Sequence, residues 1–316
     1  MSQTRNFLSA HSILVALIVL FLVMLILFRD KLLSRGVLLS FLHSCTILGM
    51  LTVGESIVLI SGGIDLSNGT LVGMTSILAA WIALQSGVPS ILVGSLVVCL
   101  IIGCVSSSLI IGAGFPPLIG TLVAMGIAEG ITYTVTRGSP LPLSNETLVW
   151  LGQANAWGIP FYSFAWIGIV MAAYLILSRT TFGRHVYSVG GSEKFAYRCG
   201  VNVKRVKLAV YLTSALLAWL AGIAYVSYAA SGAARAGGGG GFSYMLDSAS
   251  ASIIGGVSLS GGRGNVLDAT LGTMFFALLY MTVIFLNISP VLEGAFRGIL
   301  LLIVVLYAYL RETRLR

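Results

Sequence analysis

The sequence predicts an all-α integral membrane protein, a polytopic helical bundle of about ten membrane segments, some of them discontinuous. Two observations predict this class. Hydrophobic residues make up 57% of the 316 residues and charged residues only 9%, whereas a soluble domain carries about 25% charged residues. The apolar residues also form continuous runs rather than alternating with polar ones. Because backbone groups in lipid must be hydrogen-bonded internally, such runs favour helices over barrel strands.

Ten apolar runs are candidate membrane segments of one transmembrane domain over residues 1–316. A full crossing needs about 20 apolar residues. Runs 71–84 and 247–260 are shorter and adjoin glycine-rich stretches, so we expect them to belong to discontinuous helices. The first run is followed by Arg29-Asp30-Lys31 without a small-residue cleavage site, which indicates a retained span rather than a signal peptide. The runs are 11–28, 37–60, 71–84, 90–113, 115–135, 161–177, 208–230, 247–260, 266–286 and 290–310.

The lysines and arginines predict how the chain lies in a bacterial inner membrane, because these residues gather in cytoplasmic loops. Segment 178–207 holds seven of the 18, and the tail 311–316 holds three. Six apolar runs precede the first segment and four follow it. We therefore expect 178–207 and both termini in the cytoplasm.

Two other segments, 136–160 and 231–246, are then expected on the external side. The second contains an unbroken glycine run from Gly237 to Gly241, and each glycine in a helix costs about 1 kcal/mol relative to alanine. This run is either a flexible linker or a loop that adapts to an external partner, and the sequence favours neither. One cluster disagrees with the orientation, since Arg29, Lys31 and Arg35 would also lie outside.

Composition excludes several functions. The net charge of +8 comes from loops whose basic residues are not interleaved with aromatic ones, so no nucleic-acid partner is expected. The four cysteines, at positions 45, 99, 104 and 199, lack the spacing of a disulfide framework or a zinc site and are expected to be small buried apolar residues. No Gly-x-x-x-x-Gly-Lys-Ser/Thr loop, catalytic triad or metal-ligand cluster occurs. We therefore expect no enzyme and no bound cofactor, and any ATP must be hydrolysed by another chain.

A short helix is predicted within 178–207, from Glu193 to Cys199. Ser192 suits the N-cap, Glu193 suits the positive end of the helix, and Gly200 suits the position just after it. Such a helix either lies in a partner's groove or packs on the chain's own loops. The residues expected to share its apolar face are Phe195, Ala196 and Cys199.

Two glycine-rich stretches resemble each other, Gly62–Gly69 (GGIDLSNG) and Gly255–Gly262 (GGVSLSGG). Each lies between two apolar runs, and the predicted orientation brings both to the same side, which favours a parallel internal repeat. Chance similarity in a chain with 38 glycines is the alternative. Asp65 is placed either to meet substrate hydroxyls or to cap a helix that begins near Ser67, and we favour capping.

Ionisable residues inside the apolar runs are costly in a membrane and often functional. Glu55, Glu129, Arg297 and His43 are of this kind. A structural pair between helices, or a group that faces a wet cavity and binds nothing, is favoured over substrate contact. We predict that both glutamates face the protein interior. The candidate substrate pathway consists of Glu55, Gly62, Gly63, Asp65, Ser67, Glu129, Ser258 and Ser260.

Three blocks of sequence resemble, in the same order, the permeases of the ribose/xylose/galactose class of ABC importers. The first block is Ser61–Ser67 and the third is Gly255–Gly264. The second comprises Gly183-Arg184, Gly190-Gly191, Gly200-Val201-Asn202-Val203 and the basic run Lys204–Lys207. The resemblance implies that 178–207 is a cytoplasmic coupling loop, with contact residues Gly183, Arg184, Gly191, Ser192, Glu193, Phe195, Ala196, Cys199 and Gly200.

The resemblance implies a permease that pairs with a second copy or a sister permease within membrane lipid. Two cytoplasmic ATPase subunits would dock on 178–207 and use the ATP, and an external binding protein would deliver a monosaccharide or similar polyol. The chain departs from the family pattern at Phe195 and Tyr197, where small residues are usual, at Tyr244-Met245, where a glutamate is usual, and at Asp268, where glycine is common.

Two other functions compete with this interpretation. The first is a secondary transporter coupled to protons through Glu55 or Glu129, which an uncoupler would stop directly. The second is a membrane enzyme or scaffold, against which the absence of a convergent catalytic set argues.

Overall fold

The computed structural model describes residues 12–234 and 241–287, with single positions beyond them at 292, 295, 298, 299, 302 and 306. Most of this part is helical, and its four strands are two residues long. The predicted all-helical fold is confirmed. The helices are α2 (Ser12–Leu32), α3 (Arg35–Ile60), α4 (Asn68–Ala83), α5 (Val88–Ile111), α6 (Pro117–Thr136), α7 (Glu146–Gln153), α8 (Phe161–Arg179), α9 (Thr181–Gly191), α10 (Glu193–Arg198), α11 (Val203–Ala229), α12 (Gly241–Ile254) and α13 (Val266–Phe285).

Seven helices of the described part are long and apolar enough to cross a membrane: α2, α3, α5, α6, α8, α11 and α13. Helix α4 is a shorter apolar helix, as expected for run 71–84. The predicted count of about ten segments is not confirmed, and run 290–310 lies outside the described residues except for single positions. The limits predicted for run 247–260 are wrong, because Gly255 and Gly256 follow the end of α12.

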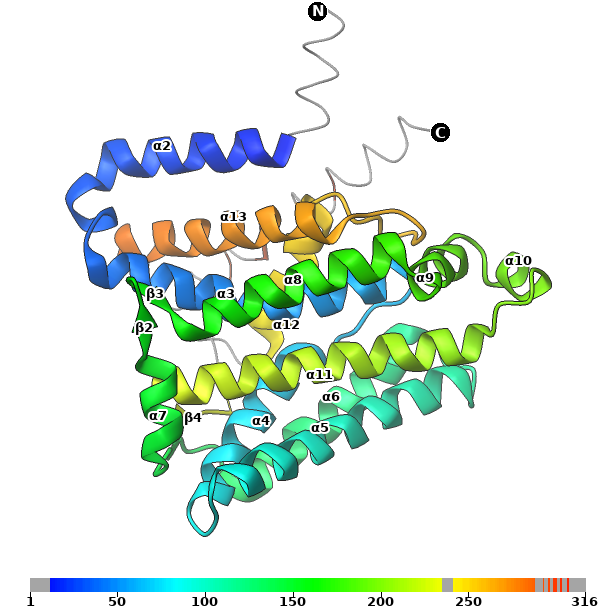
Figure 1. The fold of residues 1–316 in the computed structure, drawn as a ribbon, viewed down its shortest axis with the longest axis horizontal. Helices are drawn as coiled ribbons and strands as arrows, with labels where there is room; N and C mark the ends of the chain where they lie inside the picture. The colour runs from blue at the N-terminus through cyan, green and yellow to red at the C-terminus, as the bar shows by residue number, and fades with distance from the viewer. Residues whose placement is uncertain are drawn as a thin grey trace, which may run out of the picture.

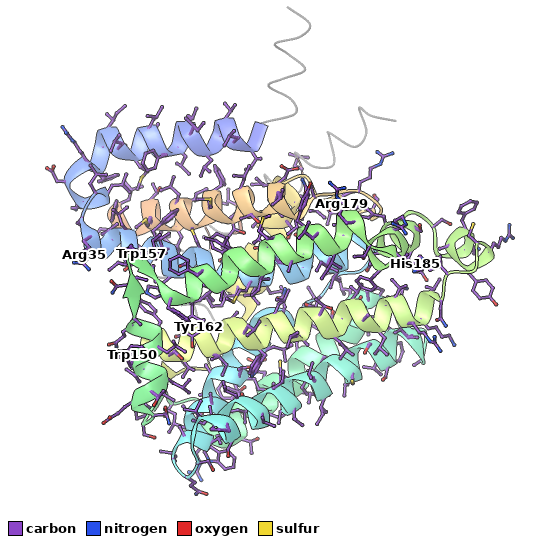
Figure 2. The ribbon with its side chains drawn as sticks, in the orientation of Figure 1. Arg35, Trp150, Trp157, Tyr162, Arg179 and His185 are labelled. Atoms are coloured by element: carbon purple, nitrogen blue, oxygen red, sulfur yellow. The ribbon has the colours of Figure 1, made fainter. Side chains whose placement is uncertain are left out.

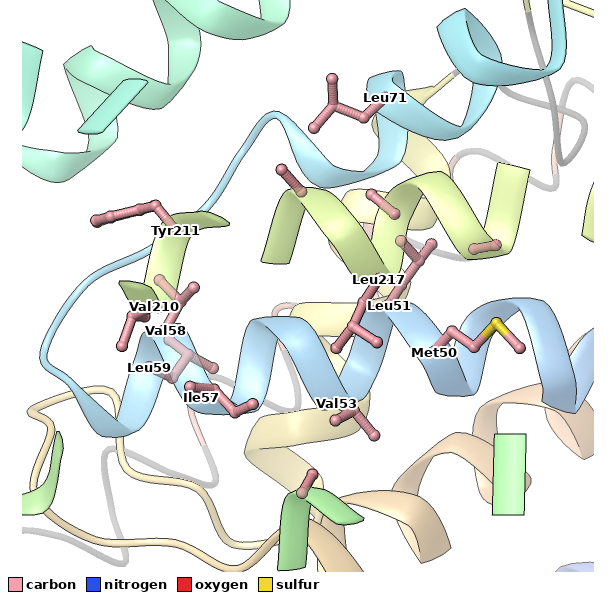
Figure 3. Packing of buried hydrophobic residues seen from close by; sticks show 14 of the residues in the cluster. Met50, Leu51, Val53, Ile57, Val58, Leu59, Leu71, Val210, Tyr211 and Leu217 are labelled. Atoms are coloured by element: carbon pink, nitrogen blue, oxygen red, sulfur yellow. The ribbon is translucent and has the colours of Figure 1, made fainter. Parts of the chain in front are cut away.

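The core lies between α3 and α11. Figure 3 shows α3 side chains such as Leu51, Val58 and Leu59 packed beside Tyr211 and Leu217 of α11. Helices α4 and α5 lie along one side of α11, and α12 and α13 along the opposite side of α3 (Figure 1). From Cys45 to Ile60 every residue of α3 is buried, which explains why this helix shows no polar face.

The outer helices expose apolar side chains. On α2, Ile26 is 80% exposed and Leu27 is 63% exposed, and α5, α6 and α8 carry further exposed leucine, isoleucine and valine residues. In water such a surface would be unfavourable at about 25 cal/mol per Å². These helices therefore fit a lipid environment or the surface of another membrane-embedded chain.

The predicted external and cytoplasmic segments lie at opposite ends of the bundle (Figure 1). At one end, β1 (Leu141–Pro142) pairs antiparallel with β4 (Ser231–Gly232), and β2 (Asn155–Ala156) pairs with β3 (Ile159–Pro160) beside α7. The opposite end holds α9 and α10. Arg35 lies near Trp157 and far from Arg179 and His185 (Figure 2), so the disagreement noted for the first basic cluster persists.

Candidate functional coupling segment and helix breaks

The segment 178–207 forms two short helices rather than one. Helix α9 begins after Thr180, whose hydroxyl accepts a hydrogen bond from the Gly183 amide at 3.3 Å. The sequence predicted one short helix in this basic segment, from Glu193 to Cys199, and did not predict α9. Glycine is needed there for packing: a Cβ at Gly183 would overlap the carbonyl of Leu177.

Helix α10 begins and ends as predicted. The Ser192 hydroxyl caps it by accepting a hydrogen bond from the Phe195 amide at 3.3 Å. Gly200 follows it with φ of 83°, a left-handed conformation that favours glycine. An ion pair of 2.6 Å between Lys207 and Glu193 joins α10 to the start of α11.

The predicted common apolar face of α10 is wrong. Ala196 is 1% exposed and packs inward, whereas Phe195 is 67% exposed and Tyr197 is 75% exposed. Cys199 is also exposed. Only the small residue therefore packs on the chain's own core. The two aromatic side chains are exposed instead, at the end of the bundle that holds α10 (Figure 1).

Three glycine-containing backbone segments meet at one point, which we call the glycine joint: Ile60–Gly62, Gly190–Gly191 and Gly261–Gly262. The amide of Gly262 donates a hydrogen bond of 2.8 Å to the carbonyl oxygen of Ile60. A Cβ added at Gly190 would overlap that same oxygen and lie 2.6 Å from the Gly262 nitrogen. A Cβ at Gly261 would lie 2.8 Å from the Gly62 Cα. The end of α9 thus touches, through main-chain atoms, the two non-helical stretches that we call the first break (61–67, after α3) and the second break (255–265, after α12).

One side chain reinforces this joint. The phenol of Tyr187 on α9 donates a hydrogen bond of 2.8 Å to the carbonyl oxygen of Gly264. Burial raises the pKa of this phenol above its ordinary value, so it remains a neutral donor near pH 7. Sequence reasoning missed Tyr187 and named Gly191 rather than Gly190. A Cβ at Gly191 would meet nothing within 4 Å.

The two glycine-rich stretches end their helices in the same way. Gly62 and Gly256 have φ of 82° and 92°, and the amides of Gly63 and Val257 bond back to the carbonyls of Val58 and Ser252, both at 3.0 Å. This is the Schellman geometry of a helix C-terminus. Gly62 and Gly256 occupy the same position in this geometry, whereas the sequence comparison paired Gly62 with Gly255. Because glycine caps are common, this explains the local likeness without requiring a repeat.

A buried polar network holds the first break. Asn68 donates a hydrogen bond of 3.0 Å to Glu55 Oε2 and one of 3.2 Å to Ser248 Oγ. Asp65 Oδ1 accepts from the amide and hydroxyl of Ser67 at 2.9 and 2.6 Å, and Asp65 Oδ2 accepts from Ser214 at 2.6 Å. Asp65 therefore fixes Ser67, the residue that precedes α4. The donors to Asp65 Oδ1 are the amide and hydroxyl of Ser67 rather than an amide of α4, so Asp65 supports the start of the helix as predicted but does not cap it. The network joins α3, α4, α11 and α12.

The structure separates the two glutamates. Glu55 is 1% exposed, which confirms its interior position. Glu129 lies on an exposed part of α6, so the prediction that it faces the interior of the chain is wrong. His43 is buried and stacks on Tyr228 with ring centres 3.8 Å apart. Arg297 lies outside the described residues.

The remaining pathway candidates fall on the two helix breaks. Gly62, Gly63, Asp65 and Ser67 belong to the first break, whereas Ser258 and Ser260 lie in the second, where the amide of Ser260 bonds to the Ser258 hydroxyl at 3.1 Å. Their part in a substrate pathway remains a prediction. Cys45 and Cys99 are buried as expected, but Cys104 and Cys199 are exposed, which contradicts the expectation for those two.

Most of the chain, including the two helix breaks and the segment with α9 and α10, matches a known protein family. The family described as "Branched-chain amino acid transport system / permease component" matches residues 37–305. The chain belongs to this permease family. The match spans the core, both helix breaks and the segment with α9 and α10.

Three relatives of this permease are named as permeases for ribose or L-arabinose. The Ribose import permease protein RbsC of Escherichia coli is 30% identical over 310 residues, covering 96% of this permease and 94% of that protein. RbsC of Bacillus subtilis is 32% identical over 279 residues, with coverage of 85% and 83%. The L-arabinose transport system permease protein AraH of Escherichia coli is 31% identical over 268 residues, with coverage of 82% and 78%.

The resemblance drawn from the three sequence blocks is therefore confirmed. The alternative of a proton-coupled secondary transporter finds no support among these relatives. No solved structure matches the permease.

Proposed function

We propose that this permease is the membrane-spanning subunit of an ATP-binding-cassette importer for a monosaccharide or similar polyol. Its relatives carry the names of ribose and arabinose permeases, which favours a sugar over the branched-chain amino acids in the family's description. Two copies, or this chain and a sister permease, enclose the substrate path. In such a pair, the exposed Glu129 of α6 faces the substrate path instead of lipid.

The segment with α9 and α10 is the docking site for a cytoplasmic ATPase. The observation that carries this assignment is the exposure of Phe195 on α10, a helix that is itself fixed by buried Ala196 and by the Lys207–Glu193 ion pair. An exposed aromatic side chain on a rigid support is suited to fill a partner's groove. Because α10 is already held in place, little conformational entropy is lost when the ATPase docks on it.

The glycine joint connects this docking site with the membrane core. A displacement of α9 acts directly on the ends of α3 and α12, because Gly190 already touches both breaks. ATP binding to the ATPase then shifts the pair of permeases between inward-open and outward-open states through a difference in affinity for the two states. The external binding protein docks at the opposite end, beside α7, and both termini lie in the cytoplasm.

The test is to replace Phe195 with aspartate. Burying a phenylalanine side chain contributes about 1.5–3 kcal/mol, so its loss weakens ATPase docking by about one to two orders of magnitude, and the buried unpaired charge weakens it further. We expect Phe195→Asp to reach the membrane at normal abundance, to lose the co-purifying ATPase and to lose uptake of labelled sugar.

Ala196→Asp is the matched contrast, because it places the same charge one position away on the buried side of α10. This variant should lose abundance. Normal sugar uptake by Phe195→Asp with the ATPase still bound would remove Phe195 from the docking site, whereas a loss of abundance equal to that of Ala196→Asp would show that Phe195 supports the fold.

A further inference from the structure

A cleft of about 790 Å³ lies beside the coupling segment, between the end of α5 and the start of α11. Its two walls differ in character. Ile110 and Ile111, the last residues of membrane helix α5, form the apolar wall. The basic wall consists of Lys194, Lys204 and Lys207.

The charges in the cleft are unbalanced. Glu193 is the one carboxylate among its lining residues, and its Oε1 lies 2.6 Å from Lys207. Lys194 and Lys204 are exposed, and no carboxylate of the described residues lies within ion-pair distance of either. Two lysine ammonium groups therefore remain for a ligand, which must be an anion.

The position of the cleft adds an apolar requirement. It lies where two membrane-crossing helices end, so one side of it continues into the apolar surface of the bundle. The turn after α5 carries Phe115, which is 45% exposed, and the following helix exposes Leu118 and Ile119. A ligand that fits both walls has an anionic head and an apolar tail.

We propose that this cleft binds the headgroup of an anionic phospholipid, with the phosphate at Lys194 and Lys204 and the glycerol and acyl carbons against Ile110 and Ile111. The amino end of α11, which begins at Val203, directs its partial positive charge to the same cleft. The bound lipid ties α10 and α11 to α5, so the coupling segment rests on the membrane surface. A zwitterionic lipid binds less favourably, because its own ammonium group is repelled by the two lysines.

The experiment first measures lipid retention by the purified permease alone, so its failure is independent of the proposed transport function, and the ATPase is added only in a last step. The permease is titrated with phosphatidylglycerol or phosphatidylcholine, and bound lipid is counted by native mass spectrometry. The test variant is Lys194→Gln/Lys204→Gln. The control is Arg179→Gln/Arg198→Gln, which removes the same charge from the same segment at exposed positions outside the cleft.

We expect the wild type and the control to prefer phosphatidylglycerol over phosphatidylcholine. The test variant should bind phosphatidylglycerol about thirtyfold more weakly, which corresponds to about 2 kcal/mol for two lysines near an anionic lipid. Size-exclusion profiles verify that both variants remain folded.

Three outcomes would overturn the proposal. The first is an equal loss of phosphatidylglycerol in test and control variants, which would indicate general charge attraction. The second is displacement of phosphatidylglycerol by inorganic phosphate at equal concentration, which would identify a free-phosphate site. The third is release of the lipid when the partner ATPase is added, which would assign the cleft to the protein interface.

Discussion

Replacing Gly190 with alanine tests whether the glycine joint is as close-packed as the structure indicates. The new Cβ would overlap the Ile60 carbonyl oxygen and lie 2.6 Å from the Gly262 nitrogen, two atoms that are hydrogen-bonded to each other at 2.8 Å. Because the contacts are backbone atoms, no side chain can rotate out of the way. The segments must therefore separate.

The cost follows from three contributions. Overpacking costs about 1–3 kcal/mol, and loss of the hydrogen bond costs about 1 kcal/mol. Alanine returns about 1 kcal/mol through its better helix propensity. The free energy of unfolding should therefore fall by about 1–3 kcal/mol, measured by thermal unfolding of the purified permease.

The neighbouring glycine supplies the control. Gly191→Ala is chemically the same change at the next position, and its Cβ meets nothing within 4 Å. It should leave stability unchanged or raise it slightly. Gly190→Ala should also lower sugar uptake per molecule in the membrane, because α9 no longer touches both breaks. A Gly190→Ala protein as stable and active as Gly191→Ala would refute the close packing of the joint.

Two further predictions follow from the polar network and the orientation. Glu55→Leu should lower the free energy of unfolding, measured by thermal unfolding, by about 1–3 kcal/mol, because it removes the hydrogen-bond acceptor of Asn68. Glu55→Gln and the exposed-site control Glu129→Leu should change it little. Equal losses of stability in the two leucine variants would argue against the network. The second prediction uses a protein in which serine replaces the exposed Cys104 and Cys199. In that background, a membrane-impermeant maleimide should label Arg184→Cys only from the cytoplasm and Trp157→Cys only from outside. Labelling of both positions from one side would contradict the orientation.

Local chemistry was predictable from the sequence where it depends on a few neighbouring residues. The serine cap and glycine end of α10 were found because Ser192 and Gly200 flank the helix at the required positions. The contact of Asp65 with the start of α4 followed from its spacing to Ser67 in the same way. Such contacts span only a few residues, so chain order determines them.

Features that depend on packing between distant segments were not predictable. Helix α9 was not predicted, because Gly183 and Gly190 are unfavourable in a helix by themselves and are needed there only for close approach to Leu177 and Ile60. The outward direction of Phe195 depends on which side of α10 meets the core. Glu129 was placed inside because its run is apolar, but an apolar run does not distinguish the interior of one chain from its outer surface.

The glycine joint responds differently to compression and to tension. When α9 moves toward the membrane core, main-chain atoms already in contact resist at once, and the displacement passes to α3 and α12 without any change of rotamer. When α9 moves away, these contacts open. The hydrogen bond from the Tyr187 hydroxyl to the Gly264 carbonyl still links α9 to the second break, while the bond from Gly262 to Ile60 joins the two breaks to each other. A push from the cytoplasm is therefore transmitted rigidly, whereas a pull can separate the parts.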